Sequence, residues 1–260
     1  MHSEQIDAYL RRIRADRPAA PTARALHDLH LAHLRAVPFE NLSIHLGENI
    51  ELTEKALVTK VVEAGRGGFC YELNGAFGAL LGALGFGVTL LQARVCDDAG
   101  QPGIPYDHLA LRVRTEDGGD WLADVGFGTH SHLPLAFGER GEQNDPGGRF
   151  LLEDAPEGDL RVSMDGKPQY LLETRPRELA DFRIGAWYHR TSPASHFTRS
   201  LVCSLLTGNG RVTLGGRTLT TTMDGERQVT ELASEAEVLA AYDRHFGIRL
   251  DREPVVGGTG

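Results

Sequence analysis

Cys70 is the residue of this chain best placed to do chemistry, because of the segment before it. "RGGFC" (66–70) puts two glycines and a phenylalanine ahead of the thiol, and the apolar stripe of the next 15 residues predicts a helix from Cys70 to Gly85. A helix N-terminus offers unpaired N–H groups and partial positive charge, which favour a thiolate and can hold an oxyanion, and glycines let the backbone come close. The segment fits either a nucleophile or a small buried hydrophobic residue, the usual role of a free cysteine.

A nucleophilic cysteine needs a general base and a group that orients the base. His108 opens the β-forming segment "HLALRVR", Asp124 ends "WLAD", and "TEDGGD" between them predicts a tight turn. An antiparallel hairpin brings the start of its first strand beside the end of its second, so His108 and Asp124 are expected to meet, facing or diagonally. Each alone also fits a structural role, as a hydrogen-bonded histidine or a turn-capping aspartate. The order Cys, His, Asp favours a catalytic triad.

Helices and strands in separate parts of the chain must position these residues. Periodicity predicts helices over residues 6–13, 22–37 and 53–64, the last two capped by Thr22 and Thr53. A short terminal helix is expected over 234–247, followed by a loose tail at 253–260. Surface loops are expected at 138–148 and 153–159, and antiparallel strands at 88–95, 108–114, 121–125, 150–152, 169–174, 201–206 and 211–214.

Composition narrows the class of protein. The chain of 260 residues is 41% apolar and 24% charged, which is ordinary for a globular protein able to bury a large core. A net charge of −9 argues against nucleic acid as a partner. No run approaches the roughly 18 apolar residues of a spanning helix, and the N-terminus lacks the apolar core of a secretory signal, so we expect no membrane partner and a cytoplasmic location. Cys70, Cys96 and Cys203 are odd in number and far apart, which indicates free thiols.

Two histidine groups do not predict a metal site. His27, His30 and His33 share one helix face, but no carboxylate or cysteine near them completes a ligand set, and we expect a partly exposed face. His130 and His132, in "GFGTHSH", lack supporting ligands as well. No metal is therefore expected.

With these residues in place, the chain resembles the arylamine N-acetyltransferase family. The resemblance rests on "VPFEN" (37–41), "RGGFCYELN" (66–74), His108 before an alternating strand, "DVGFG" (124–128) and "TSPASHF" (191–197), in family order over most of the chain. It implies an α+β fold in three parts: a helical bundle (1–86) that carries the nucleophile, an antiparallel β-barrel (87–190) that carries the histidine and aspartate, and an α/β lid (191–260).

The resemblance also implies an activity. A papain-like triad of Cys70, His108 and Asp124 would take an acetyl group from acetyl-CoA and pass it to an arylamine, arylhydrazine or N-hydroxyarylamine in a ping-pong reaction, as in xenobiotic metabolism. The Cys70 amide and one neighbour near the His108 strand would hold the oxyanion. By the same resemblance, Phe39, Val95 and Phe127 would line the acceptor pocket, Tyr188 and Ala194 would contact CoA, and Arg66 would form a structural ion pair with Glu40 that Asn41 joins.

The sequence also departs from common family members. "DDAGQPGIPYD" (97–107) before the histidine is rich in Pro and Asp, with Ile104 and Pro105 where some relatives have small or hydroxyl residues near CoA. Three alternatives stay open: an amide synthase that takes a polyketide from a carrier-protein thioester, a thiol hydrolase with the same triad, and a non-catalytic binding module. The natural acceptor, the acyl length, the mode of CoA binding and any homo-oligomer are also left open.

Overall fold

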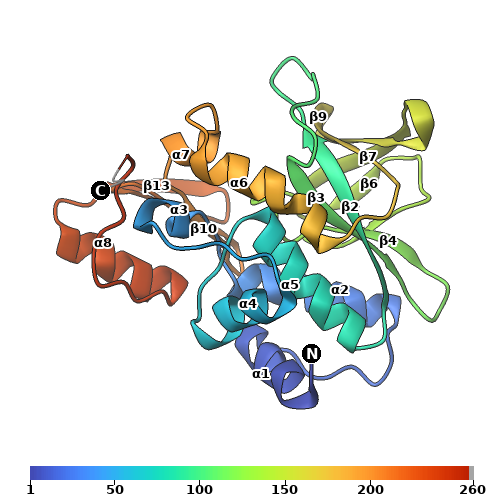
Figure 1. Ribbon diagram of the computed structural model, residues 1–260, viewed down its shortest axis with the longest axis horizontal. Coiled ribbons are helices and arrows are strands. Elements are labelled where there is room, and N and C mark those ends of the chain that lie inside the picture. The colour runs from blue at the N-terminus through green and yellow to red at the C-terminus, as the bar shows by residue number, and fades with distance from the viewer. Residues whose placement is uncertain (258–260) are drawn as a thin grey trace.

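The computed structural model describes residues 1–257, and its first part is helical (Figure 1). Thr22 and Thr53 cap their helices through side-chain oxygens, as expected. The five-residue helix over Leu42–Leu46 was not expected, since it is too short to show a periodicity. The helices are α1 (Ser3–Ile13), α2 (Ala23–Ala36), α3 (Leu42–Leu46), α4 (Glu54–Val58), which continues as the π-helical turn η1 (Thr59–Glu63), and α5 (Cys70–Ala83).

The middle of the chain forms an eight-stranded antiparallel sheet that curls into a nearly closed barrel, in the order β5-β4-β3-β2-β9-β8-β7-β6. Its strands are β2 (Gly87–Val95), β3 (His108–Arg114), β4 (Asp120–Ala123), β5 (Leu135–Ala136), β6 (Gln143–Asp145), β7 (Gly148–Asp154), β8 (Leu160–Met164) and β9 (Lys167–Leu172). The expected loop at 138–148 is wrong in part, because it contains the edge strand β6 and the first residue of β7. Its polar residues are compatible with an edge strand, which needs only one paired side.

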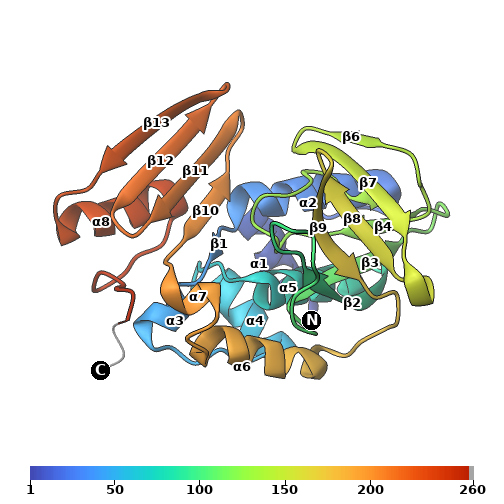
Figure 2. The same cartoon turned by 90° about the horizontal axis from the view of Figure 1, so that it is seen from above.

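The C-terminal part of the chain forms most of a second, five-stranded sheet, in the order β1-β10-β11-β12-β13. Figure 2 shows this sheet and the barrel at opposite ends of the molecule, with helices between them. Its edge strand β1 comes from residues 39–40, so the N-terminal part of the chain completes the C-terminal sheet. The strands of this sheet are β1 (Phe39–Glu40), β10 (Cys203–Leu206), β11 (Gly210–Gly215), β12 (Thr218–Met223) and β13 (Glu226–Glu231). The remaining elements are η2 (Pro156–Gly158), which joins β7 to β8 of the barrel, and η3 (Leu179–Phe182), α6 (Arg183–Thr191), α7 (His196–Arg199), α8 (Glu235–Ala241) and η4 (Tyr242–Phe246).

These bounds confirm the expected terminal helix and most of the expected strands. The division at residues 86 and 190 stays a prediction. The last three residues of the expected tail lie outside the described residues. No helix within residues 1–257 combines the length and apolarity needed to cross a membrane.

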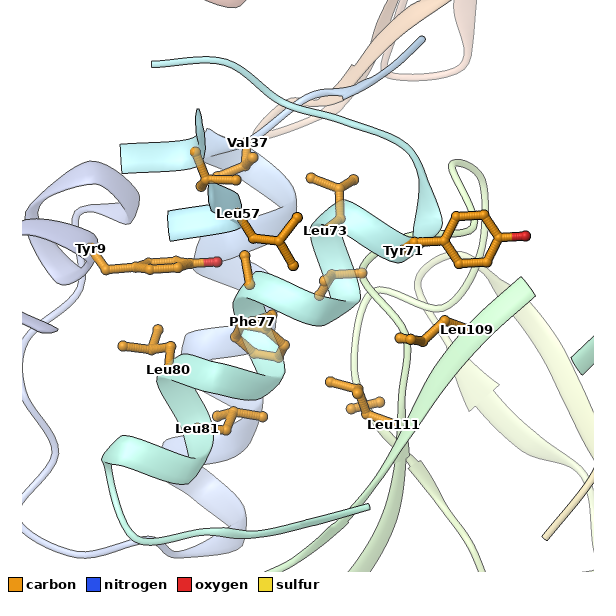
Figure 3. Close-up of a cluster of buried hydrophobic side chains, with 14 of the residues drawn as sticks. Tyr9, Val37, Leu57, Tyr71, Leu73, Phe77, Leu80, Leu81, Leu109 and Leu111 are labelled. Atoms are coloured by element: carbon orange, nitrogen blue, oxygen red, sulfur yellow. The ribbon is translucent and has the colours of Figure 1, made fainter. Parts of the chain in front are cut away.

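Helix α5 is the centre of the larger hydrophobic core, and it fixes where Cys70 lies. Leu73, Phe77 and Leu80 on this helix are fully buried, and Leu109 and Leu111 of β3 pack against the same cluster (Figure 3). Because α5 packs on both the other helices and the barrel, its N-terminus is held beside the start of β3.

Candidate active site

The two glycines before Cys70 are required by close backbone packing. A methyl group at Gly67 would overlap the carbonyl oxygen of Pro38, and one at Gly68 would lie 2.6 Å from a carboxylate oxygen of Glu72. Neither glycine has a positive φ. Gly67 is therefore needed for space beside Pro38, which precedes β1, and Gly68 for space beside Glu72, so a left-handed turn is not the reason for either. The close approach of this backbone to a ligand stays a prediction.

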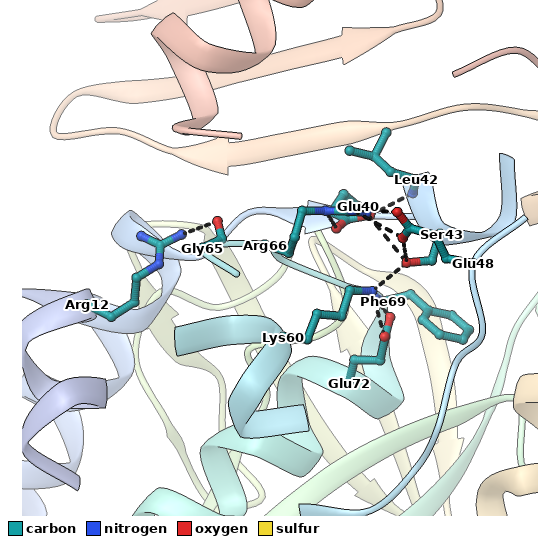
Figure 4. Close-up of polar contacts among 10 residues, drawn as sticks. All are labelled: Arg12, Glu40, Leu42, Ser43, Glu48, Lys60, Gly65, Arg66, Phe69 and Glu72. Atoms are coloured by element: carbon teal, nitrogen blue, oxygen red, sulfur yellow. Dashed lines mark hydrogen bonds and ion pairs between the residues drawn. The ribbon is translucent and has the colours of Figure 1, made fainter. Parts of the chain in front are cut away.

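Cys70 occupies the first turn of α5, as predicted, and is 4% exposed. The helix start is stabilised by Glu72, whose Oε2 accepts the Phe69 N–H at 3.3 Å and whose Oε1 lies 2.6 Å from Nζ of Lys60 (Figure 4). The first turn of an α-helix has no intrahelical acceptor for its own N–H groups, so the Cys70 amide is available to an oxyanion.

Arg66, four residues before the thiol, forms ion pairs with two glutamates. Nε of Arg66 lies 3.0 Å from a carboxylate oxygen of Glu40, which is fully buried, and Glu48 pairs with the same guanidinium at 3.1 Å. Burial alone would raise the pKa of Glu40, but the positive charges of Lys60 and Arg66 and the hydrogen bonds lower it. The predicted ion pair is present.

Asn41 does not join this ion pair. Its amide nitrogen donates to the carbonyl oxygens of Phe197 and Ser200, and its Oδ1 accepts the Val202 N–H at 2.9 Å. Asn41 ties the "VPFEN" segment to the chain that leads into β10, a contact between distant parts of the sequence that local spacing does not reveal.

His108 and Asp124 meet as the hairpin predicted, with 2.7 Å between Nε2 and Oδ2. Strand pairing ends at Leu111 and Ala123, so the two side chains reach each other diagonally across the open end. Burial alone would lower the pKa of His108, but the Asp124 carboxylate and the Cys70 sulfur raise it to about 10. Asp124 is buried, and the nearby imidazole nevertheless holds its pKa well below the usual range. Both shifts favour an imidazolium–carboxylate pair.

Four further groups hold Asp124 in place, one of which is the Tyr170 hydroxyl, which donates to Oδ2 at 3.4 Å. Asn74 Nδ2 donates to Oδ1 of Asp124 at 2.8 Å, and the Gly126 N–H donates to the same oxygen at 3.0 Å. The backbone N–H of Asp124 donates to Nε2 of His30 at 3.2 Å, while Nδ1 of His30 lies 2.9 Å from the carbonyl oxygen of His132. His30 therefore joins both ends of the loop 124–132.

The partly exposed histidine face expected on α2 holds for His27, which is half-buried, and is wrong for the other two histidines. His30 and His33 are fully buried, and burial lowers the pKa of both, that of His30 to about 4. His30 is therefore neutral at pH 7, so that one ring nitrogen can accept and the other donate. Histidine is polar and therefore suggested an exposed face, but the His30 ring packs edge-on to Phe77 in the core.

One cavity of about 440 Å³ brings the predicted site residues together. Cys70 and His108 line it, Asp124 lies behind His108, and all five predicted ligand contacts also line it: Phe39, Val95, Phe127, Tyr188 and Ala194. The Phe127 ring stands edge-on to His108, with 5.1 Å between centroids. Of the other lining residues, sequence reasoning had placed only Ile104 near a ligand, and it missed the rest: Gly103, Asp107, Gly126, His189, Ser195, His196 and Phe197.

The geometry defines a class of protein. A thiol at a helix N-terminus, a histidine–carboxylate pair and a partly aromatic cavity can carry out acyl transfer through a thioester, as in cysteine-dependent transferases and hydrolases. Within residues 1–257 there is no group of three or more His, Cys, Asp or Glu side chains arranged to hold a metal.

Comparison with known proteins identifies the family. A family profile described as N-acetyltransferase matches residues 22–255. An arylamine N-acetyltransferase of Mycolicibacterium smegmatis is 36% identical over 254 residues, which cover 94% of this chain and 92% of that protein. A Salmonella typhimurium protein named arylamine N-acetyltransferase / N-hydroxyarylamine O-acetyltransferase is 36% identical over 214 residues, 80% of this chain and 76% of its own length. The chain belongs to the arylamine N-acetyltransferase family.

A solved structure supports the same assignment. The Mycobacterium marinum arylamine N-acetyltransferase in complex with CoA is similar with a TM-score of 0.84 and 32% identity, over 94% of this chain and 92% of that one. The α+β fold and the family expected from the sequence are thereby confirmed.

Proposed function

We propose that this protein transfers an acetyl group from acetyl-CoA to the nitrogen of arylamines or arylhydrazines, or to N-hydroxyarylamines, through an acetyl-cysteine on Cys70. The observation that carries the proposal is the single cavity that contains Cys70 and His108, with Asp124 2.7 Å behind the imidazole. Family membership and the names of the relatives support the choice of donor and acceptor.

In the first half-reaction Cys70 attacks the donor. His108, held as an imidazolium by Asp124, stabilises the thiolate, which adds to the acetyl carbonyl carbon of acetyl-CoA. The negatively charged oxygen of the tetrahedral intermediate accepts a hydrogen bond from the Cys70 N–H at the positive end of α5. When the carbonyl reforms, the bond to the CoA sulfur breaks and the His108 imidazolium gives its proton to the departing sulfur, so that CoA leaves as a thiol and His108 becomes neutral.

In the second half-reaction an amine removes the acetyl group. The amine nitrogen adds to the acetyl carbon of the acetyl-cysteine, and neutral His108 takes the proton that the nitrogen must lose. The carbon–sulfur bond then breaks, which restores the Cys70 thiolate beside a protonated imidazole and releases the N-acetyl product. The strong pairing with Asp124 keeps the ring oriented through both steps.

The cavity fits small aromatic acceptors. Phe39, Val95 and Phe127 would contact the aromatic ring, and Tyr188 and Ala194 would contact CoA. A volume of about 440 Å³ lies within the usual range for a small-molecule site and is small for a long polyketide chain. These observations favour the acetyltransferase over the amide synthase. Free thiols at Cys70, Cys96 and Cys203 and a CoA thioester as donor support a cytoplasmic location.

Mass spectrometry of the intact protein tests the proposal. We expect acetyl-CoA to add one acetyl group to the protein, and an arylamine such as anisidine to remove it and appear as N-acetylanisidine. Cys70→Ser serves as the control and should acquire no thioester. Loss of the acetyl group without any amine would instead indicate a thiol hydrolase. No adduct on a folded protein whose Cys70 can be alkylated would contradict the acetyltransferase.

A further inference from the structure

A second histidine–carboxylate pair lies in the wall of the same cavity. Nε2 of His189, on α6, is 2.9 Å from Oδ1 of Asp107, the residue before β3. The two side chains are 8% and 15% exposed. The pair joins residues 82 positions apart in the sequence, and the proposed acetyl transfer does not use it.

Ser195 completes the arrangement, and the contacts of His189 indicate its tautomer. Nδ1 of His189 lies 3.0 Å from Oγ of Ser195, and that oxygen accepts the Phe197 N–H at 3.2 Å as the N-cap of α7. Nε2 of His189 faces two acceptors, Oδ1 of Asp107 and the Asp107 carbonyl oxygen at 3.3 Å, so Nε2 carries a proton. This leaves Nδ1 to accept the serine hydroxyl. We call His189, Asp107 and Ser195 the bridge.

Asp107 extends the bridge to the parts of the site that carry the thiol. Its Oδ2 accepts the Val95 N–H at 3.2 Å. The Tyr71 hydroxyl is shared between the carbonyl oxygens of Tyr106 at 2.6 Å and Asp107 at 3.0 Å. The Cys70 Sγ lies 4.0 Å from the Asp107 carbonyl oxygen. Asp107 therefore connects the end of β2, the first turn of α5 and, through His189, the helix α6.

The backbone beside the bridge shows that α6 is tightly docked. Tyr106 has a φ of 58°, a conformation that a bulky residue keeps only where its surroundings hold it. A methyl group at Gly185 of α6 would overlap the carbonyl oxygen of Tyr106. Figure 1 shows α6 and α7 following one another between the C-terminal sheet and the barrel. The bridge lies where this segment meets the strand that begins with His108.

We propose that His189 is a positioning residue that holds the α6–α7 segment against the barrel over Cys70, and thereby sets how an acyl donor reaches the thiol. The segment supplies Tyr188, Ala194 and Phe197 to the cavity wall, so its position decides the width of the cavity. Both ring nitrogens of His189 are engaged within the protein, so neither is available to substrate. The part that concerns the acyl donor rests on the proposed acetyl transfer.

Alkylation of Cys70 tests the bridge without acetyl-CoA, so that its failure is distinct from failure of the proposed function. The ratio of the rate with a bulky reagent, N-(1-pyrenyl)maleimide, to the rate with iodoacetamide measures the width of the path to the thiol. We expect His189→Ala to raise this ratio about tenfold, because the contact of Nε2 with the Asp107 carboxylate and its hydrogen bond to the Asp107 carbonyl oxygen are both lost. His189→Gln keeps an N–H donor for Asp107 and should restore most of the wild-type ratio.

His196→Ala is the matched control. His196 is exposed, lines the same cavity, and its imidazole makes no hydrogen bond to the described residues, so this change removes an equal ring without breaking the bridge. An unchanged ratio in His189→Ala, or an equal rise in His196→Ala, would overturn the proposal. If His189→Ala does not fold, Asp107→Asn takes its place, because it removes the charge of the carboxylate that faces His189. An unchanged ratio in Asp107→Asn, or an equal rise in His196→Ala, would then overturn the proposal.

Acetylation by acetyl-CoA provides the second readout. A positioning role predicts that His189→Ala raises KM for acetyl-CoA about tenfold while kcat changes less than threefold. A loss confined to kcat would instead place His189 in the chemical steps and refute the positioning role.

Discussion

The ion pair between Arg66 and Glu40 is a structural support of the nucleophile's segment, and removing one partner should be costly. The Glu40 side chain is fully buried and that of Arg66 is 10% exposed, so Arg66→Ala leaves a buried carboxylate without its closest positive charge. Breaking a buried pair in this way costs about 3–5 kcal/mol of the free energy of unfolding. For a chain of this size, that predicts a fall in Tm on the order of 10 °C.

The assay is denaturant and thermal unfolding of matched variants. Arg24→Ala is the control, because Arg24 and Asp28 form a pair 3.9 Å apart whose side chains are 92% and 75% exposed. That change should cost less than about 0.5 kcal/mol. The double variant Glu40→Gln with Arg66→Met should recover part of the loss, since the uncompensated charge is gone.

The pH dependence gives an independent check of the same reasoning. The pKa of Glu40 is lowered in the folded protein, so its contribution to stability is present above the unfolded pKa of about 4.3 and is lost as the pH falls through the folded value. The gap between wild type and Arg66→Ala should therefore narrow on acidification below pH 5. A cost under 1 kcal/mol at pH 7, or a gap that widens in acid, would refute this account of the ion pair.

Three more predictions concern the triad. Because the pKa of His108 is raised to about 10, its pairing with Asp124 stabilises the folded protein fully below about pH 6.5, and this stability is lost as the pH rises through 10. The difference in denaturant midpoint between wild type and Asp124→Asn should therefore shrink from pH 6 to pH 10, and a constant difference would contradict the pairing. Gly126→Ala should lower the rate of Cys70 alkylation at least tenfold, because the added methyl would lie 2.7 Å from Cα of Cys70. A wild-type rate would show that the loop around residue 126 moves to accommodate the methyl group. His30→Ala should lower kcat more than tenfold, because it frees both ends of the loop 124–132. The control His33→Ala also removes a buried ring from α2 and should lower Tm with little effect on kcat; equal effects of the two variants on kcat would exclude a specific role for His30.

Local patterns predicted the parts of the site that depend on neighbours in sequence. The apolar stripe that begins at Cys70 predicted that the thiol would start a helix, and the turn between two β-forming segments predicted that His108 would meet Asp124. Helix periodicity and hairpin pairing act over a few residues, so composition and spacing reveal them. The motifs around these residues then predicted the family and the α+β fold, both of which the comparisons confirm.

Contacts between distant segments could not be predicted in this way. His30 lies 94 residues from Asp124, and His189 lies 82 from Asp107. Strand β1 pairs with a strand more than 160 residues later, and β13 is exposed and charged, so no local apolar pattern marks either one.

The sequence alone therefore determined the helix that presents Cys70, the hairpin that joins the histidine to its carboxylate, and the family. Only the tertiary structure decided which histidines of α2 are buried, which groups Asn41 bonds, and that His189, His196 and Phe197 from α6 and α7 also line the cavity. The physical reason is that a side chain's burial and hydrogen-bond partners depend on which segments pack together, and that packing is a property of the whole fold.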